Sequence, residues 1–380
     1  MELNKIIIAP DSFKGCLSAS EVAECCAAAV KAVLPGTEAV AIPLADGGEG
    51  TVATLGESLG GVSRTCTVKD PLGREITTTY LLSADGKSAL MEVAQTSGLT
   101  LLKSDERNPL KTSSYGLGML IADAVNLGCR TIMVGLGGSA TNDGGMGMLS
   151  ALGYRFYGKD GHRLDGCGED LAKVVSIDGS EVNPALKDTH FIVACDVDNR
   201  LTGPLGATAV FGPQKGAYST MLIALEEGMQ NYAKVAGEFT GKDLSTLRGG
   251  GAAGGLGAAF HAFLNAVMEP GIDMVLETLN FEDRIKGADL IITGEGRIDA
   301  QSLMGKVLSG VLKSSKSAGV PLIAIAGLVE DSDRLNEAGV CALLPIQSGA
   351  CTLDEAMEPA TAKENITRTV TQALRIIRQF

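Results

Sequence analysis

The stretch IIIAPDSFKG (residues 6–15) decides the fold class of this 380-residue chain. It opens with an apolar, β-branched run that predicts a short buried strand. Ser18 and Glu21 then form a capping box, and apolar residues recur at helical spacing after them. A second strand is predicted at residues 40–42, followed by a second helix. This β-α-β-α order is typical of a parallel sheet with helices packed against it.

The pattern changes after the second helix and later returns. Residues 63–93 contain short strands separated by turn signals, which predicts an antiparallel meander. Apolar runs typical of parallel strands then recur, and a terminal helix with a capping box follows them. These runs are residues 131–134, 290–292, 322–325 and 342–344, and the capping box is Thr352 with Glu355.

We therefore expect an α/β protein with a discontinuous Rossmann-like parallel-sheet domain and an inserted mixed α/β domain. Strand counting gives about six parallel strands. The Rossmann-like domain is expected to comprise residues 1–62, 112–150 and 286–380, and the inserted domain residues 63–111 and 151–285. The active site is expected in the cleft between the domains. The alternative is two domains in sequential order along the chain.

The charge balance restricts the partners. The sequence has 32 Lys and Arg residues against 45 Asp and Glu residues, a formal net charge of −13. Such a surface repels nucleic acid and anionic membranes, so neither is expected as a partner. It also repels anionic metabolites, and any anion site must be built locally from backbone N–H groups, a few basic side chains or a bound cation.

Cysteine content and hydropathy indicate a cytoplasmic protein. The nine cysteines are scattered and include no C-x-x-C pair, which argues against a disulfide framework or a zinc site. The amino-terminal apolar run is too short for a secretion signal, and no apolar run approaches the ~20 residues that span a membrane. A homo-oligomeric state is left open.

Glycine and carboxylate residues gather in the loops expected after four of the strands. These loops are residues 11–15, 45–50, 135–145 and 294–299. In an open parallel sheet, ligands bind beyond the carboxyl ends of the strands, so we expect the four loops to line one crevice. Each loop alone also has a purely structural explanation, because an aspartate such as Asp46 can cap the following helix.

The loop at residues 135–145 allows a rival interpretation. Gly135-x-Gly137-x-x-Ala140 matches a dinucleotide fingerprint, which would make the chain an NAD(P)-dependent oxidoreductase. The nearby carboxylate of Asp143 argues against a pyrophosphate there. The sequence contains no P-loop, so a nucleotide would be held by glycine-rich backbone at a helix start. A third class is a non-catalytic small-molecule binding protein. Such proteins usually carry an export signal, and the amino-terminal apolar run expected here is too short for one.

Another candidate site follows the apolar run at residues 191–195. Asp196 and Asp198 lie two residues apart, and on an extended chain their side chains point to the same side. Paired carboxylates suit a hard cation. The structural alternative is that one caps a turn while the other is solvated. Lys215 lies in a later turn and is a further basic candidate.

Several blocks of this sequence, taken in order, resemble the bacterial type I glycerate kinases. They extend over almost the whole chain and are together far more specific than either glycine motif alone. The blocks are IAPDSFKG (8–15), PLADGGEGT (43–51), GGSATNDGG (137–145), ACDVDN (194–199), GPQKGA (212–217), AAGGLG (252–257) and TGEGR (293–297). The resemblance implies a two-domain α/β fold, ATP with Mg²⁺, and D-glycerate as the phosphate acceptor. In that family the usual product is 2-phosphoglycerate.

On this basis we expect Asp46 to accept the proton of the attacking hydroxyl, with Asp143, Glu295 and Asp299 as alternatives. Lys14 and Arg297 are expected to bind the glycerate carboxylate or to neutralise the transferring group, and Asp196 and Asp198 to hold Mg²⁺. The predicted catalytic residues are Asp46, Lys14 and Asp196. The other predicted substrate contacts are Ser12, Gly47, Gly48, Glu49 and Asp299, and the predicted nucleotide contacts are Gly137, Gly138, Ser139, Ala140, Thr141, Asn142, Asp143 and Lys215.

Overall fold

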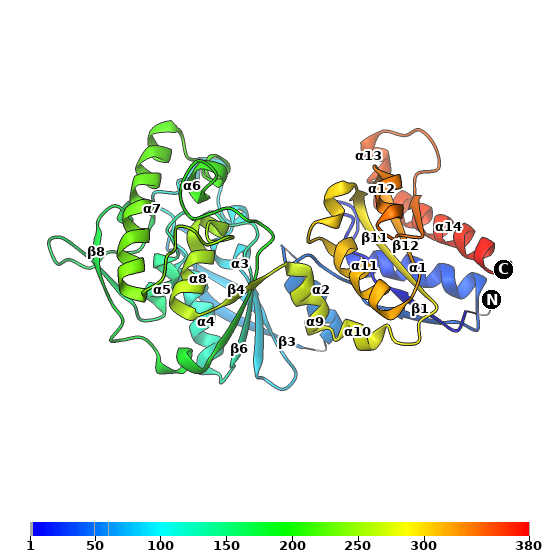
Figure 1. Ribbon diagram of the computed structural model, residues 1–380, viewed down its shortest axis with the longest axis horizontal. Coiled ribbons are helices and arrows are strands. Elements are labelled where there is room, and N and C mark those ends of the chain that lie inside the picture. Colours follow the sequence, from blue (N-terminus) through cyan, green and yellow to red (C-terminus); the bar gives the residue numbers. More distant parts are fainter. Residues whose placement is uncertain (1–2, 49, 60, 380) are drawn as a thin grey trace. The chain divides into compact units, whose positions relative to one another are not determined.

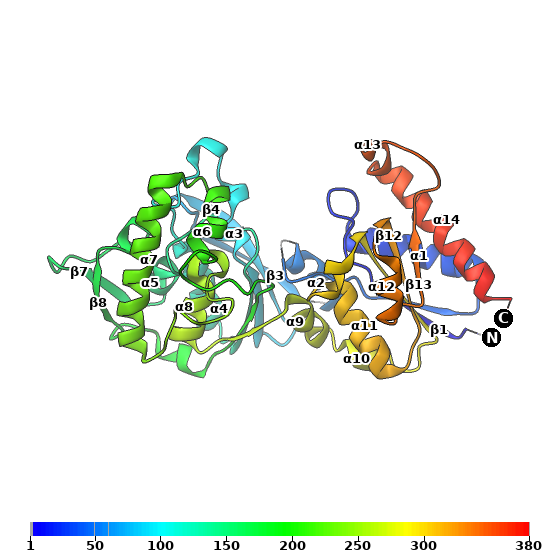
Figure 2. The same cartoon turned by 45° about the horizontal axis from the view of Figure 1, so that its top comes forward.

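The computed structural model describes residues 3–48, 50–59 and 61–379, and the chain divides into two compact units. Unit 1 comprises Met1–Asp46, Ala53–Ser58 and Pro270–Phe380, and unit 2 comprises Gly47–Val52 and Leu59–Glu269. Unit 2 is therefore inserted into the chain of unit 1. Both units are α/β in construction (Figures 1 and 2).

Unit 1 is built on a parallel five-stranded sheet with the order β13-β12-β11-β1-β2. Its strands are β1 (Lys5–Ile8), β2 (Glu38–Ala41), β11 (Leu290–Ile298), β12 (Leu322–Val329) and β13 (Ala342–Pro345). The register pairs Ile6 with Leu290, so the start of the chain lies against a strand formed much later. The apolar run at the amino end thus forms a central, fully buried strand, as its β-branched residues predict.

Helices cover both faces of this sheet (Figure 1). On one face α1 and α14 pack together over a core that includes Ile6, Ile292 and Ile325. The capping box of Ser18 and Glu21 is present at the start of α1. The helices of this unit are α1 (Ala19–Val33), α9 (Gly271–Thr278), α10 (Phe281–Arg284), α11 (Val307–Ala318), α12 (Ser332–Glu337), α13 (Leu353–Ala356) and α14 (Pro359–Ile377), and η7 (Ala300–Leu303) is a 3₁₀ turn.

Unit 2 contains a mixed six-stranded sheet with the order β10-β9-β6-β5-β4-β3. Strands β10, β9, β6 and β5 run parallel, whereas β4 and β3 are antiparallel, which confirms the meander predicted for residues 63–93. The strands are β3 (Val62–Lys69), β4 (Glu75–Leu82), β5 (Ser88–Glu92), β6 (Thr131–Gly135), β9 (His190–Ala194) and β10 (Val267–Glu269), and β7 (Arg155–Gly158) pairs separately with β8 (Val174–Asp178).

A second core lies between this sheet and its helices, and Phe156, Phe191, Tyr232 and Phe260 are among its fully buried side chains. The helices are α3 (Ala94–Ser97), α4 (Tyr115–Asn126), α5 (Met146–Ala151), α6 (Ala207–Phe211), α7 (Ser219–Thr240) and α8 (Leu256–Leu264), and α2 (Thr51–Leu59) spans the boundary between the units. Short 3₁₀ turns are η1 (Leu99–Leu101), η2 (Ser104–Glu106), η3 (Gly168–Asp170), η4 (Pro184–Asp188), η5 (Pro213–Lys215) and η6 (Ala252–Gly255).

The two longest segments for which the structure corrects the expected domain boundaries are residues 112–150 and 270–285. Residues 112–150, expected in the Rossmann-like domain, lie in unit 2 because β6 pairs with β5 and β9. The parallel sheet of unit 1 consequently has five strands rather than about six. An apolar run identifies a buried parallel strand but contains no information about which of two sheets it joins. Conversely, residues 270–285, expected in the inserted domain, belong to unit 1.

The end of the chain also differs in detail from the prediction. The capping box of Thr352 and Glu355 starts the short helix α13 rather than the terminal helix. Helix α14 begins separately at Pro359, where the carboxylate of Glu358 accepts the N–H of Thr361 at 2.7 Å.

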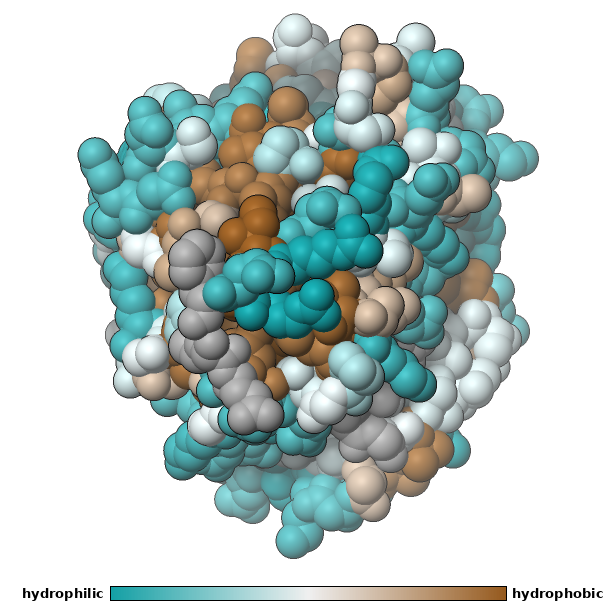
Figure 3. Space-filling model, turned by 90° about the vertical axis from the view of Figure 1, so that its right-hand side faces the viewer, coloured by the Kyte–Doolittle hydropathy of each residue, from teal (hydrophilic) through white to brown (hydrophobic). Residues whose placement is uncertain are grey.

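The face of unit 1 shown in Figure 3 is largely polar, with apolar patches between the hydrophilic side chains. Its most exposed large apolar side chains are Met304, Leu328, Leu353, Met357 and Ile376. Within the described residues, no helix combines the length and apolar character needed to cross a membrane.

Candidate active site

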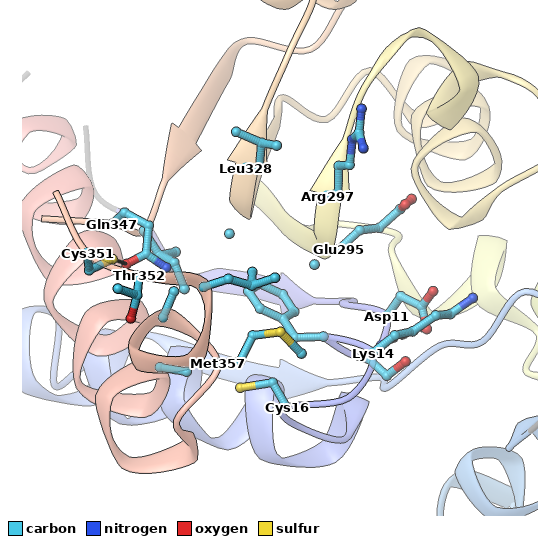
Figure 4. A pocket seen from close by; sticks show the side chains of 18 of the residues that line it. Asp11, Lys14, Cys16, Glu295, Arg297, Leu328, Gln347, Cys351, Thr352 and Met357 are labelled. Atoms are coloured by element: carbon cyan, nitrogen blue, oxygen red, sulfur yellow. Dashed lines mark hydrogen bonds between the residues drawn. The ribbon is translucent and has the colours of Figure 1, made fainter. Parts of the chain in front are cut away.

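A pocket of about 770 Å³ lies at the carboxyl ends of the strands of unit 1 (Figure 4). After β1 the chain returns to the sheet as β2, on one side of β1, whereas after β11 it returns as β12, on the opposite side of β11. The neighbouring pair β1 and β11 is therefore a topological switch point, where two loops leave the sheet in opposite directions and a crevice opens between them. We call this the unit 1 pocket.

The loop after β1 contributes the first group of polar side chains. Asp11 is buried, and its carboxylate accepts the N–H of Ser12 at 2.6 Å. The N–H of Asp11 donates to the carbonyl of Gly294 at 2.8 Å, which ties this loop to β11. Burial and the nearby charge of Asp46 raise the pKa of Asp11 to about 6. A carboxyl group in this range can exchange a proton near neutral pH.

Lys14 and Asp46 form an ion pair in the same pocket. The Nζ of Lys14 lies 2.9 Å from Oδ2 of Asp46, and the lysine side chain is largely exposed whereas the aspartate is about one quarter exposed. Burial disfavours the charged lysine, but the hydrogen bond and charge of Asp46 outweigh this and raise the pKa of Lys14. At the start of α2, Glu92 accepts the N–H of Val52 at 2.7 Å.

Strand β11 contributes Glu295 and Arg297. The sequence placed these residues in a loop, but β11 continues to Ile298 because β12 pairs with it as far as Val329. The carboxylate of Glu295 accepts the N–H of Leu308 at the start of α11, at 3.0 Å. Burial is the main cause that raises the pKa of Glu295 to about 7.

Arg297 lines the unit 1 pocket, but its guanidinium points away from Asp11 and Lys14 (Figure 4). It donates to Glu330 at 2.6 Å and lies 3.4 Å from the carboxylate of Asp299. Asp299 itself caps η7 by accepting the N–H of Gln301 at 2.8 Å, and it is not part of the pocket wall. The predicted cation is thus present at the pocket and is held by two carboxylates.

A second, smaller pocket of about 180 Å³ lies in unit 2, and we call it the unit 2 pocket. Its wall includes Gly47 and Gly48, the glycine loop after β6, and the segment after β9. The N–H groups of Gly137, Gly138 and Ser139 have no acceptor among the described residues. Gly138 adopts a left-handed conformation with φ of +72°, which helps to turn successive N–H groups toward one side. Such a backbone arrangement suits an anion.

Two glycine-rich loops meet behind this pocket without intervening side chains. The N–H of Gly144 donates to the carbonyl of Gly254 at 2.9 Å. A Cβ atom on Gly254 would lie 2.0 Å from the carbonyl oxygen of Thr141, so only glycine allows this approach. The block at residues 252–257 therefore shapes the loop at residues 137–145 from behind, and Ala252 and Ala253 complete the pocket wall.

Lys215 is the one buried basic side chain among the described residues that line the unit 2 pocket. Its Nζ donates to the carbonyl oxygen of Thr141 at 2.7 Å. Burial lowers the pKa of Lys215 to about 7, although the charge of Asp143 acts in the opposite direction. An anion bound in the pocket would favour the charged form of this side chain.

Asp143 organises the glycine loop from inside the protein. Its carboxylate is fully buried and accepts both the N–H and the hydroxyl of Ser114 at 2.7 Å, the N–H of Gly145 at 3.1 Å and that of Gly147 at 3.3 Å. Burial raises the pKa of Asp143 despite these donors. All of these donors come from the protein itself, and Asp143 is not part of the pocket wall.

The dinucleotide interpretation does not fit this geometry. In the fingerprint, the glycine loop opens directly into a helix whose N-terminus receives the pyrophosphate. Here Gly135 still belongs to β6, and α5 begins only at Met146. The N–H of Ala140 donates to the carbonyl of Ser97 at 2.7 Å instead of facing a ligand.

Comparison with known proteins agrees with the site. A model of the glycerate kinase family matches residues 6–378. The chain belongs to the glycerate kinase family. It is 46% identical over 357 residues to a glycerate kinase of Bacillus subtilis (94% of each chain) and 42% identical over 377 residues to glycerate 2-kinase of Escherichia coli (98% of this chain and 99% of the relative). A crystal structure reported as glycerate kinase 2 from Salmonella typhimurium LT2 matches with a TM-score of 0.90 at 42% identity, covering 99% of both chains.

Most of the predicted site residues line one of the two pockets. Ser12, Lys14, Asp46 and Arg297 line the unit 1 pocket, whereas Gly47, Gly48, Gly137, Gly138, Ser139, Asp196 and Lys215 line the unit 2 pocket. Ala140, Thr141, Asn142, Asp143, Asp198 and Asp299 line neither, and Glu49 lies outside the described residues. Thr141 and Asn142 are buried, and one polar atom of each has no partner among the described residues.

Three polar residues of the unit 1 pocket wall were not among the predicted site residues. Asp11 and Lys306 line the unit 1 pocket together with Gln347. Asp11 lies within the block at residues 8–15, and its position directly after a predicted buried strand could have identified it as a site residue. Lys306 and Gln347 follow no recognisable motif, and only the folded chain brings them to this wall.

Proposed function

We propose that this chain transfers the γ-phosphate of ATP to a hydroxyl of D-glycerate and releases ADP and 2-phosphoglycerate. The observation that carries the proposal is the unit 1 pocket, where the Lys14–Asp46 ion pair stands beside two buried carboxyl groups, Asp11 and Glu295, in a member of the glycerate kinase family. The E. coli relative named glycerate 2-kinase supports transfer to the 2-hydroxyl.

In this proposal Asp46 accepts the proton of the attacking hydroxyl. Lys14 holds the carboxylate in place through its 2.9 Å contact and neutralises negative charge on the transferring group. Arg297, with Ser12 of the same pocket wall, binds the carboxylate of glycerate after exchanging one of its two present partners. Positioned proton transfer of this kind contributes about 10²–10⁴-fold to the rate.

The nucleotide phosphates are assigned to the unit 2 pocket. The N–H groups of Gly137–Ser139 have no acceptor among the described residues, and the Nζ of Lys215 is held in a buried position. Together they supply donors and positive charge suited to phosphate oxygens.

Mg²⁺ is the proposed metal ion, and the carboxylate oxygens available in unit 2 fit its preference. Asp196 lines the unit 2 pocket and is exposed, so its carboxylate is accessible to a hydrated ion. Asp198 is exposed as well but lies outside the pocket wall, which leaves Asp196 as the stronger ligand of the pair. When bound, the ion would neutralise charge on the phosphates.

The described residues contain one group of three side chains with ligand atoms close enough to hold a metal, namely Cys167, Glu169 and Asp170. Asp170 accepts the N–H of Gly166 at 3.0 Å and contacts Lys173 at 3.0 Å. These contacts explain the cluster as part of a 3₁₀ turn, and we assign it no metal.

The test is a coupled assay for ADP release from ATP, run with D-glycerate present and omitted. We expect release only with D-glycerate and Mg²⁺, and phosphorus NMR should identify 2-phosphoglycerate. ADP release that does not depend on D-glycerate would overturn the proposal. Formation of 3-phosphoglycerate would overturn only the assigned hydroxyl.

A further inference from the structure

More than half of the wall of the unit 1 pocket has no role in the chemistry proposed above. Opposite the charged residues, the wall is apolar, with Phe13, Leu328, Ile346, Leu353, Met357 and Ala362 as its main side chains. Several of them are exposed to solvent despite lining a pocket, namely Leu328 at 47%, Leu353 at 72% and Met357 at 36%. Exposed apolar side chains gathered in one concave wall indicate a ligand with an apolar part.

The apolar wall is held by ordered elements. Thr352 and Glu355 cap helix α13 reciprocally, with contacts of 2.8 and 3.3 Å, and this fixes the helix that carries Leu353. The end of the Met357 side chain approaches Gly15 so closely that a Cβ atom there would lie 3.0 Å from its Cε. Figure 4 shows Met357 and Cys16 between the charged residues and the group formed by Gln347, Cys351 and Thr352.

Glycerate alone does not account for this wall. It is a small, fully polar three-carbon acid, whereas a pocket of about 770 Å³ is typical of much larger ligands. The charged end, with Lys14, Arg297 and Lys306, matches an anionic group. The ligand of this pocket therefore has a large apolar or aromatic part joined to an anionic part. Of the two substrates proposed above, only ATP has this combination.

We propose that the apolar wall of the unit 1 pocket binds the adenosine of ATP, with the purine ring between Leu328, Met357 and Leu353. This inference rests on the proposed function for the identity of the nucleotide. Lys14, at the charged end of the same pocket, then faces the transferring phosphoryl group, in agreement with the charge-neutralising role assigned to it. The apolar wall contributes nucleotide affinity and does not take part in the chemical step.

Gln347 is placed to recognise the base. It lines the pocket, and its Oε1 accepts weakly from Nδ2 of Asn365 at 3.4 Å and from Sγ of Cys351 at 3.5 Å. Its amide nitrogen has no acceptor among the described residues. A primary amide can donate and accept side by side, which is the pattern that pairs with the N6/N7 edge of adenine and not with the corresponding edge of guanine.

The experiment measures ADP binding to the full chain by calorimetry for Leu328→Glu and Met357→Glu. We expect each variant to weaken ADP binding by about tenfold or more, because a carboxylate in the apolar wall opposes the purine ring. Ile376→Glu is the matched control, since Ile376 is 63% exposed in unit 1 and lies on α14 outside the pocket. Thermal unfolding verifies that all three variants fold.

The outcomes separate this inference from the proposed function. Unchanged ADP affinity in both pocket variants, in a chain that still phosphorylates glycerate, would overturn the adenosine site alone. The adenosine site would be supported, and the proposed reaction overturned, if the variants bind ADP more weakly while the unsubstituted chain releases no ADP in response to glycerate. Gln347→Leu gives an independent readout, for which we expect a lower preference for ADP over GDP, and an unchanged preference would remove Gln347 from base recognition.

Discussion

The two pockets of this molecule use different chemical means. The unit 1 pocket is wide, and its polar groups are side chains at the ends of parallel strands, including Lys14, Asp46 and Glu295. The unit 2 pocket is small, and its polar groups are mainly backbone N–H groups supported by one buried lysine, Lys215. The first can change its charge through its carboxyl groups, whereas the second presents fixed backbone donors beside a single lysine.

This difference indicates a division of labour between proton transfer and anion binding. Carboxyl groups with a pKa near neutrality, such as Asp11 and Glu295, are useful where protons move. Backbone donors do not titrate and need little reorganisation, which suits the binding of phosphate. Substitutions in the two pockets should therefore affect different kinetic parameters, and the following predictions test that contrast.

The largest effect is expected for Asp46→Asn. The amide cannot accept the proton of the attacking hydroxyl, so kcat should fall by about 10²–10⁴-fold. The affinity for ATP should remain close to that of the unsubstituted chain, because phosphate binding is assigned to unit 2. Steady-state ADP release at varied ATP measures both quantities, and an unchanged kcat would exclude Asp46 as the base.

A large effect on stability is expected for Asp143→Asn. The carboxylate accepts four donors in a fully buried position, and an amide nitrogen would oppose at least one of them. Leaving a buried donor unpaired costs about 1–3 kcal/mol, and we expect a loss of this size in the free energy of unfolding. Urea denaturation measures it. A stable variant with weakened ATP binding would instead favour the direct nucleotide contact that the sequence predicted.

A smaller, selective effect is expected for Lys215→Met. The substitution keeps the length of the side chain but removes its charge, so the affinity for ADP should fall by about tenfold, which corresponds to ~1.4 kcal/mol. The exposed Lys234→Met on α7 serves as the matched control. Calorimetry with ADP compares the two, and equal affinities would contradict a phosphate role for Lys215.

A further prediction concerns pH. Asp11 and Glu295 have folded-state pKa values raised from 3.8 to about 6 and from 4.5 to about 7. Between these limits the folded chain holds more protons than the unfolded chain, so this contribution to the free energy of unfolding decreases as pH rises from about 4 to about 7. The decrease ends about one pH unit above the pKa of Glu295, where both groups are ionised in the folded chain as well.

The double variant Asp11→Asn with Glu295→Gln isolates this contribution. Neither amide titrates, so the decrease in unfolding free energy between pH 4 and pH 7 should be shallower than in the unsubstituted chain. Urea denaturation at several pH values provides the comparison. Parallel pH profiles for the two proteins would show that these carboxyl groups are not shifted as described.

The sequence identified the local elements well where one physical signal was sufficient. The buried run at residues 6–8, the capping box at Ser18 and the meander at residues 63–93 all follow from short-range patterns. The position of β6 does not, since its apolar residues satisfy either sheet and its partners β5 and β9 are distant in sequence. A domain boundary at such a strand depends on long-range pairing.

The candidate site shows the same limit. Lys14 and Asp46 were assigned because each follows a predicted strand, and the structure brings them into contact. Asp143 was assigned to the nucleotide because it lies in the block at residues 137–145 that carries the family resemblance, whereas it is enclosed by Ser114 and backbone donors. Whether a polar side chain faces a pocket or the protein interior is decided by tertiary packing, which glycine spacing does not encode.

The insertion of unit 2 into unit 1 has a consequence for biosynthesis. Thr293 donates to the carbonyl of Ala9 across 284 positions of the chain, and β1 has no parallel partner on its β11 side until that later segment emerges from the ribosome. At about 5–20 residues per second, the interval is on the order of 15–60 s. During this interval the apolar residues Ile6–Ile8 have no β11 partner, and the whole of unit 2, which ends at Glu269, is synthesised before β11. Ribosome-associated chaperones would meet this chain at its amino end.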